Sequence, residues 1–188
     1  MTNRIPRAFK GPRKLITKGL LIVYTGSGKG KTTSAMGVAL RALGHNRRVA
    51  VVQFMKGKWP TGEVKALKKF GTMVNVTSVG DGFTWETKSL KKDVKLATTA
   101  WKQCLQLLKE NKYDLYLFDE ILYALYYRFL PLKKVVRAMK KRPPTAHIIL
   151  TGRHAPKELI RMADLVTEMK EVKHPYKKGI LAQSSIDF

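Results

Sequence analysis

The stretch YTGSGKGKTT, residues 24–33, carries residue types that bind phosphate. Glycines let the backbone wrap closely around oxygen atoms, and backbone N–H groups at a helix start favour negative charge. We expect Lys31 to reach phosphate oxygens, and the Thr32 hydroxyl to ligate a magnesium ion that bridges them. The usual spacing, G-x-x-x-x-G-K-S/T, is shortened, because the nearest glycine before this ending is Gly26. The expected phosphate-binding residues are Gly26, Ser27, Gly28, Lys29, Gly30, Lys31, Thr32 and Thr33.

A matching pair of acids follows the apolar run YDLYLF, where Asp119 and Glu120 stand at the end of an expected strand. In nucleotide-binding sheets such an acid holds magnesium beside the phosphate loop, directly or through water. Both acids could instead stabilise the start of the next helix through its dipole, and the two roles are compatible. Arg153 ends another expected strand, where it would either contact phosphate or be an ordinary surface cation.

Large aromatic residues occur in two further loops. The segment QFMKGKWPTGE, residues 53–63, contains Trp59, and GDGFTWET, residues 80–87, contains Phe83 and Trp85. Aromatic side chains in glycine-flanked loops beside a phosphate site favour a flat, apolar second ligand. The alternative is a lid whose aromatic rings pack on its own domain.

These residues must be positioned by regular elements, and strands alternate with helices along the chain. Short, nearly continuous apolar strands of this kind predict a parallel sheet covered on both faces, an α/β fold of the P-loop NTPase-like (RecA-like) type. Ligands of such sheets bind at the carboxyl ends of the strands, where every motif above falls. We expect strands over 20–24, 48–54, 74–79, 113–120, 147–153 and 164–172, and helices over 32–43, 62–70, 87–110, 121–127, 131–141 and 156–163.

The long helix over 87–110 has apolar residues at steps of three and four, which predicts one buried face. Cys104 lies on this helix and is the only cysteine, so no intrachain disulfide is possible, and core packing is favoured over reactivity. The expected buried face consists of Leu90, Val94, Ala97, Trp101, Leu105 and Leu108.

Length and composition fit one domain, because 188 residues with 44% hydrophobic content can form a substantial core. No apolar run is long enough for a membrane span and no signal peptide is apparent, so we expect a cytoplasmic protein. We expect residues 1–18 to be a basic arm that is flexible or docks on a partner, and residues 19–188 to form the domain.

The net charge of +24 favours anionic partners such as nucleotide phosphates, nucleic acid or acidic lipid. The basic residues are spread along the chain and no stripe of interleaved aromatics accompanies them. A solvated surface therefore explains the charge more simply than a dedicated nucleic-acid face does.

Taken together, GSGKGKTT, VVQFMKGKWPTGE, GFTWET, LFDE…Y, LPL…V…A…RP, IILTGR, VKH and GI.AQ..ID resemble the ATP:corrinoid adenosyltransferases of cobalamin biosynthesis. The motifs occur in the family's order over residues 19–188, and the shortened phosphate loop is itself part of the match. The N-terminal region differs, being shorter and more basic than the family's helical extension, which leaves open how the site is covered. Ser185 stands where the family commonly has glycine, a difference that we expect to matter little.

The resemblance implies that Co(I) of a corrinoid attacks the C5′ carbon of ATP, with triphosphate as the leaving group. It makes Lys31, Phe83, Trp85 and Glu120 the catalytic residues, with Thr32, Glu120 and Asp119 around Mg²⁺ (or Mn²⁺). Phe83 and Trp85 would occupy the lower face of the corrin and displace its axial ligand, with Trp59 as a further corrinoid contact. The substrate would be cobalamin, cobinamide or cobyrinic acid a,c-diamide. A flavoprotein electron donor and a homodimer are implied as well.

Two alternatives belong to other classes of protein. A RecA-like ATPase stimulated by nucleic acid would explain the charge better, but not the aromatic loop or the short phosphate loop. A corrinoid or nucleotide carrier without turnover would fit less well, because the motif residues are present.

Overall fold

The computed structural model describes residues 18–54, 61–80 and 89–187. The expected basic arm, except Lys18, and the expected corrinoid contacts Trp59, Phe83 and Trp85 lie outside the described residues. The strands are β1 (Leu21–Thr25), β2 (Val49–Phe54), β3 (Val74–Val79), β4 (Leu115–Asp119), β5 (His147–Thr151) and β6 (Leu165–Glu168). The helices are α1 (Lys31–Gly44), α2 (Gly62–Lys68), α3 (Leu90–Glu110), α4 (Ile121–Tyr126), α5 (Leu132–Lys140) and α6 (Lys157–Met162). Short 3₁₀ turns cover Gly71–Met73 and Pro175–Lys178.

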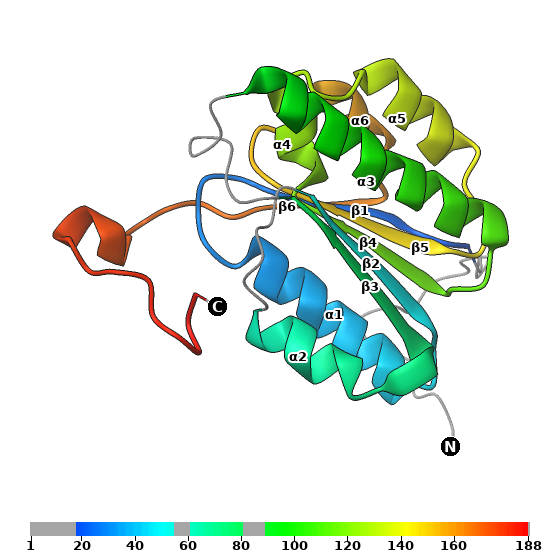
Figure 1. Ribbon diagram of the computed structural model, residues 1–188, viewed down its shortest axis with the longest axis horizontal. Helices are drawn as coiled ribbons and strands as arrows, with labels where there is room; N and C mark the ends of the chain where they lie inside the picture. The colour runs from blue at the N-terminus through cyan, green and yellow to red at the C-terminus, as the bar shows by residue number, and fades with distance from the viewer. Residues whose placement is uncertain (1–17, 55–60, 81–88, 188) are drawn as a thin grey trace, which may run out of the picture.

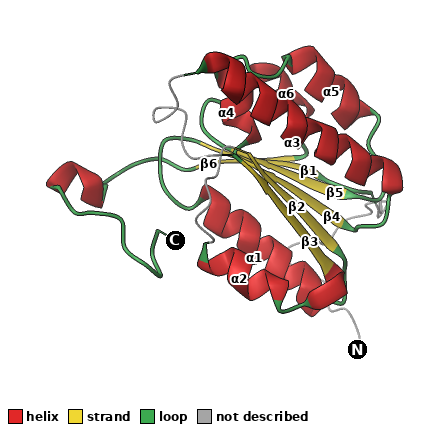
Figure 2. Cartoon of the chain, viewed as in Figure 1, coloured by secondary structure: helices red, strands yellow, loops and turns green. Residues whose placement is uncertain are grey.

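The strands form one six-stranded sheet in the order β3-β2-β4-β5-β1-β6, and every neighbouring pair is parallel. Helices α1 and α2 cover one face, while α3 to α6 cover the other (Figures 1 and 2). The predicted α/β architecture is confirmed. The order of the central strands places β1 next to β5, and β4 next to β2, so the loops that follow them meet at one edge of the sheet.

Burial of the strands follows their place in the sheet. The central strands β2 and β4 are buried along their whole length, as expected for strands packed by helices on both faces. The outer strand β3 alternates in exposure, and the other outer strand, β6, is exposed throughout. Two apolar layers result, one between the sheet and α1, the other between the sheet and α3 to α6.

Helix α3 buries half of the face that was predicted. Ala97, Trp101 and Leu108 are buried as expected, whereas Leu90 is 67% exposed and Val94 and Leu105 are also exposed. The buried face is rotated toward Ala100, Cys104 and Leu107, so the helix packs on the sheet through a mixture of small and large side chains. Cys104 is fully buried on this face, as predicted. The buried residues of α3 are Asp93, Ala97, Ala100, Trp101, Cys104, Leu107 and Leu108.

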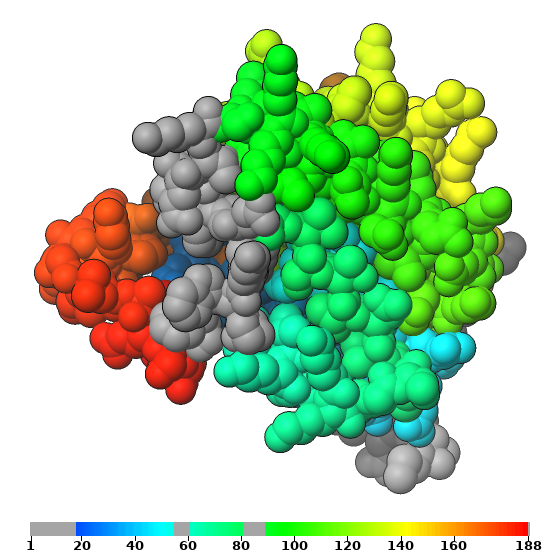
Figure 3. Space-filling view, in the orientation of Figure 1, coloured from blue at the N-terminus to red at the C-terminus, as the bar shows by residue number. Residues whose placement is uncertain are grey.

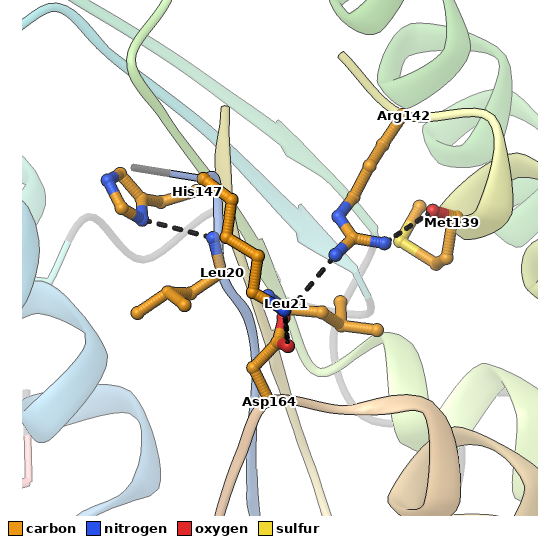
Figure 4. A network of polar contacts seen from close by, with 7 residues as sticks. Leu20, Leu21, Met139, Arg142, His147 and Asp164 are labelled. Atoms are coloured by element: carbon orange, nitrogen blue, oxygen red, sulfur yellow. Dashed lines mark hydrogen bonds and ion pairs between the residues drawn. The ribbon is translucent and has the colours of Figure 1, made fainter. Parts of the chain in front are cut away.

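The amino edge of the sheet is tied by polar contacts between elements that are distant in sequence (Figure 4). The Asp164 carboxylate accepts a hydrogen bond from the Leu21 backbone N–H at 2.9 Å and another from Arg142 at 3.4 Å. His147 Nδ1 accepts from the Leu20 N–H at 3.2 Å. These contacts fix the start of β1, and hence the strand that leads into the phosphate loop.

In the described part of the chain, no helix is both long and apolar enough to span a membrane.

Candidate active site at the carboxyl edge of the sheet

The loop between β1 and α1 is held open by glycines with positive φ. Gly26 has φ 101° and Gly30 has φ 106°, conformations that side chains with a Cβ rarely adopt. At Gly26 a Cβ atom would also lie 2.4 Å from the Met169 carbonyl oxygen. The loop is pinned to the segment after β6, since the Gly28 N–H donates to Met169 O at 2.7 Å. The shape of the loop is therefore fixed by its own glycines and by the contact with Met169.

Lys31 lies inside this loop and is only 8% exposed. Its Nζ donates to the carbonyl oxygens of Gly26, at 2.9 Å, and Gly28, at 2.6 Å. Burial lowers the pKa of Lys31, and the nearby cations Arg153 and Lys29 lower it further, while Glu120 opposes them. An ammonium group that is desolvated and surrounded by other cations gains most from an incoming polyanion.

Asp119, at the end of β4, is fully buried and faces the start of α1. Thr32 Oγ1 donates a hydrogen bond to Asp119 Oδ1 at 2.8 Å, and Thr151 Oγ1 donates a hydrogen bond to the same oxygen at 2.7 Å. Because its proton is directed to the carboxylate, the Thr32 hydroxyl keeps its lone pairs for a cation. The structure thus brings together Thr32 and Asp119, two of the three residues predicted to act with magnesium.

Glu120 adopts φ 62°, the left-handed conformation that is unusual for a residue with a side chain. Its backbone N–H donates to Thr151 Oγ1 at 2.9 Å, which holds the sharp turn after β4. Strain of this kind persists where the surrounding structure fixes it, often at functional sites. The turn places Glu120 in the same pocket as the phosphate loop. Glu120 also directly precedes α4, which is the position expected of an acid that stabilises a helix start.

A pocket of about 320 Å³ unites these groups. Arg153 lines it together with Lys29, Lys31, Thr32 and Glu120, so most of the predicted phosphate and metal residues gather in one cavity. Gly26, Ser27 and Asp119 are not among its lining residues. A larger cavity of about 580 Å³ lies between α3 and α5, but it contains none of the predicted site residues. The described residues that line the smaller pocket are Gly28, Lys29, Gly30, Lys31, Thr32, Thr33, Glu63, Glu120, Tyr123, Arg153, His174, Ile186 and Asp187.

Five of these lining residues were not predicted to belong to the site, namely Glu63, Tyr123, His174, Ile186 and Asp187. Burial raises the pKa of Tyr123, and the neighbouring Glu120 raises it further. His174 and Asp187 come from the C-terminal segment. This segment leaves the sheet, projects beyond its carboxyl edge and then turns back toward α1 (Figure 1), and it stands out from the rest of the molecule in the space-filling view (Figure 3). His174 and Asp187 lie in stretches quoted above for the resemblance, VKH and GI.AQ..ID, and this was the signal that could have found them.

The C-terminal segment contacts the phosphate loop directly, because Asp187 forms an ion pair with Lys29. Ser185, two residues earlier, has φ 73°. A residue other than glycine has a conformational cost at such a φ. The expectation that serine at this position matters little stays a prediction.

The donor atoms of the site fit magnesium better than a metal that prefers nitrogen or sulfur. Within residues 18–54, 61–80 and 89–187, no group of three His, Cys, Asp or Glu side chains could hold a metal ion. A hydroxyl and carboxylates beside a phosphate loop are the few protein ligands that Mg²⁺ takes when phosphate and water supply the others.

Comparison with known proteins agrees with this geometry. The family model described as ATP:corrinoid adenosyltransferase BtuR/CobO/CobP matches residues 17–188. The chain belongs to the ATP:corrinoid adenosyltransferase family. The corrinoid adenosyltransferase of a Sinorhizobium species is 44% identical over 173 residues, which cover 91% of this chain and 81% of the relative. That of Escherichia coli K12 is 41% identical over 171 residues, covering 91% of this chain and 86% of the relative.

Membership of the adenosyltransferase family makes the chain a transferase of a family that acts on ATP and a corrinoid. The relatives support this function and not the alternative of a nucleic-acid-stimulated ATPase.

Proposed function

We propose that this adenosyltransferase uses the pocket to hold the triphosphate of ATP as a leaving group. The observation that carries the proposal is the convergence of Lys31, the Thr32–Asp119 pair and Glu120 on one cavity. A cradle that binds all three phosphates fits displacement at the ribose carbon.

The proposed reaction is a single displacement. The Co(I) electron pair of the corrinoid substrate forms a bond to C5′ of ATP, while the C5′–O bond breaks and triphosphate leaves with that bond's electrons. Lys31, Lys29 and Arg153 lie where they would stabilise the negative charge that grows on the departing oxygen. Gly26, Ser27, Gly28, Gly30 and Thr33 would complete the phosphate contacts.

Thr32, Glu120 and Asp119 would hold Mg²⁺ (or Mn²⁺), and Asp119 also accepts the hydrogen bond that orients the Thr32 hydroxyl. When bound, the metal would neutralise part of the triphosphate charge. The protein's own contribution is to fix the hydroxyl and the carboxylates before the nucleotide arrives.

Phe83 and Trp85, with Trp59, are proposed to contact the corrinoid, on the basis of the family resemblance. Removing the Phe83 ring should leave ATP binding largely intact and slow adenosylation. Equal turnover in a Phe83→Ala variant would contradict this role. Cobalamin, cobinamide and cobyrinic acid a,c-diamide are the substrates to compare.

A homodimer is proposed as the working form, and a flavoprotein as the source of the electron. Exposed apolar side chains on the C-terminal segment support the dimer, since Val172 and Leu181 are each 81% exposed and Tyr176 is 77% exposed. Light scattering of the purified protein would measure its mass. The cytoplasmic location stays a prediction from composition.

The deciding experiment follows the visible spectrum of the protein mixed with ATP, Mg²⁺ and chemically reduced cobalamin. We expect the spectrum of an alkylated cobalamin to appear together with triphosphate, and a Lys31→Ala variant to lose at least about 100-fold in kcat. Phosphate release stimulated by DNA or RNA, without a corrinoid product, would overturn the proposal and favour the ATPase.

A further inference from the structure

Gln53 is a buried amide in a strand that is otherwise apolar. It lies in β2 and is 2% exposed, although burying an amide without hydrogen-bond partners is costly. Its Nε2 donates to Asp119 Oδ2 at 3.2 Å, and its Oε1 accepts from Ser78 Oγ at 2.8 Å. A carboxylate can only accept, so the amide nitrogen must face Asp119, and this orientation leaves the amide oxygen for Ser78.

The three residues stand side by side because of the strand register. Gln53 is the register partner of Ser78 on β3 and of Asp119 on β4. Alternation along β2 places Gln53 on the face of Val49 and Val51, which pack in the apolar layer with α1. The row of polar side chains thus continues this layer at the carboxyl edge, where α1 begins.

The row fixes both oxygens of the Asp119 carboxylate. Oδ2 accepts from Gln53, while Oδ1 accepts from Thr151 and Thr32. Rotation of the carboxylate would break these contacts together. As long as the Asp119 carboxylate stays fixed, the Thr32 hydroxyl keeps its proton directed at Asp119, and its lone pairs are left for the pocket that Thr32 lines.

We propose that Gln53, supported by Ser78, is a positioning residue for the metal–triphosphate site. Gln53 orients the Asp119 carboxylate. Asp119 in turn accepts the hydrogen bond from Thr32, which leaves the lone pairs of the Thr32 hydroxyl for the cation. Neither Gln53 nor Ser78 lines the pocket, so both act through the residues they hold. The inference rests on the metal site of the proposed function, but not on the transfer to cobalt.

The test compares ATP binding across a Mg²⁺ titration by calorimetry, without corrinoid. Gln53→Met keeps the side-chain length but removes the donor, and it should raise the Mg²⁺ concentration for half-maximal binding about 10- to 100-fold, as loss of a metal ligand's partner does. Ser78→Ala should raise it less, by about three- to tenfold, while Ser78→Thr, which keeps the hydroxyl, should restore the wild-type midpoint.

Thr77→Val is the matched control, because Thr77 lies on the same strand and its hydroxyl bonds to Asn75 instead of the row. ATP binding in the presence of a chelator separates positioning from general support of the loop. We expect Gln53→Met and Ser78→Ala to bind metal-free ATP with an affinity within about twofold of wild type. This range is far below the shift of at least about 10-fold that we expect for the Mg²⁺ midpoint of Gln53→Met. Ser78 is exposed, so Ser78→Ala should fold even if Gln53→Met does not.

A Mg²⁺ midpoint that does not move in Gln53→Met or Ser78→Ala would overturn the inference, as would an equal loss of metal-free ATP binding. The proposed function fails separately. If the midpoint moves as expected but wild-type protein forms no adenosylated corrinoid, the positioning role stands and the transfer reaction does not.

Discussion

Lys29 of the phosphate loop and Asp187 near the C-terminus form an ion pair across 158 residues of sequence. The Lys29 side chain pulls the pKa of Asp187 below its ordinary value, with the Gln183 backbone N–H as a second cause. The Asp187 carboxylate thus pairs with a cation that we assign to phosphate. Binding of ATP has to exchange one anion for the other.

An Asp187→Asn variant should therefore bind ATP more tightly than wild type. Exposed ion pairs contribute about 0.2–1 kcal/mol, which corresponds to an increase in affinity of up to about fivefold. Calorimetric titration with ATP and Mg²⁺ measures it, and Asp187→Glu, which keeps the charge, is the control. Weaker binding by Asp187→Asn would show instead that the carboxylate helps to hold the nucleotide.

The two glycines of the phosphate loop with positive φ should respond differently to alanine. At Gly30 the nearest atom to an added Cβ is the flexible Met169 sulfur at 3.4 Å, so Gly30→Ala should cost only the backbone strain, about 1–2 kcal/mol. Gly26→Ala carries the same strain and also drives its Cβ into the Met169 carbonyl. Urea unfolding should show a larger loss for Gly26→Ala, and an equal loss would contradict the tight approach of the loop to this segment.

Asp164 should make stability dependent on pH in the acid range. Its pKa is lowered, first by the hydrogen bond from Lys18 and next by the Leu21 N–H. A carboxyl whose folded pKa lies below its unfolded value of 3.8 contributes stability above that pH, and loses it as the pH falls through the folded pKa. We expect the free energy of unfolding of wild type to exceed that of Asp164→Asn at neutral pH, with the difference shrinking toward acid. A difference that is constant with pH would exclude this linkage.

Cys104 should be inert in the folded protein. Burial raises the pKa of its thiol well above the ordinary value, and the thiolate is the reactive form. An aromatic disulfide reagent should label it only after the protein is unfolded in urea. Fast labelling under native conditions would mean that α3 opens from the sheet.

The local sequence was sufficient for the elements and for the candidate phosphate-binding residues. Apolar runs of strand length, each followed by a helical pattern, predicted the strands within a few residues, because this alternation depends on local propensity and burial. Lys31, Thr32 and Asp119 were found because phosphate and magnesium require particular residue types after particular strands. The family was recognised from the same motifs.

The buried face of α3 was predicted less well. Leu90 and Leu105 fit a helical repeat, but they are exposed, since the buried stripe is centred on Ala97, Trp101 and Cys104 and lies slightly to one side of the predicted one. Periodicity identifies an amphipathic helix, whereas the shape of the surface beneath it decides which stripe is buried.

What the sequence alone determined is the chemistry: a phosphate loop, its acid partner and a fold that places both at one edge of a sheet. Only the tertiary structure decided which distant residues complete the site. Gln53 reaches Asp119 through strand register, and Asp187 reaches Lys29 through the path of the C-terminal segment. Register and chain path depend on contacts between residues far apart in sequence, so no local pattern encodes them.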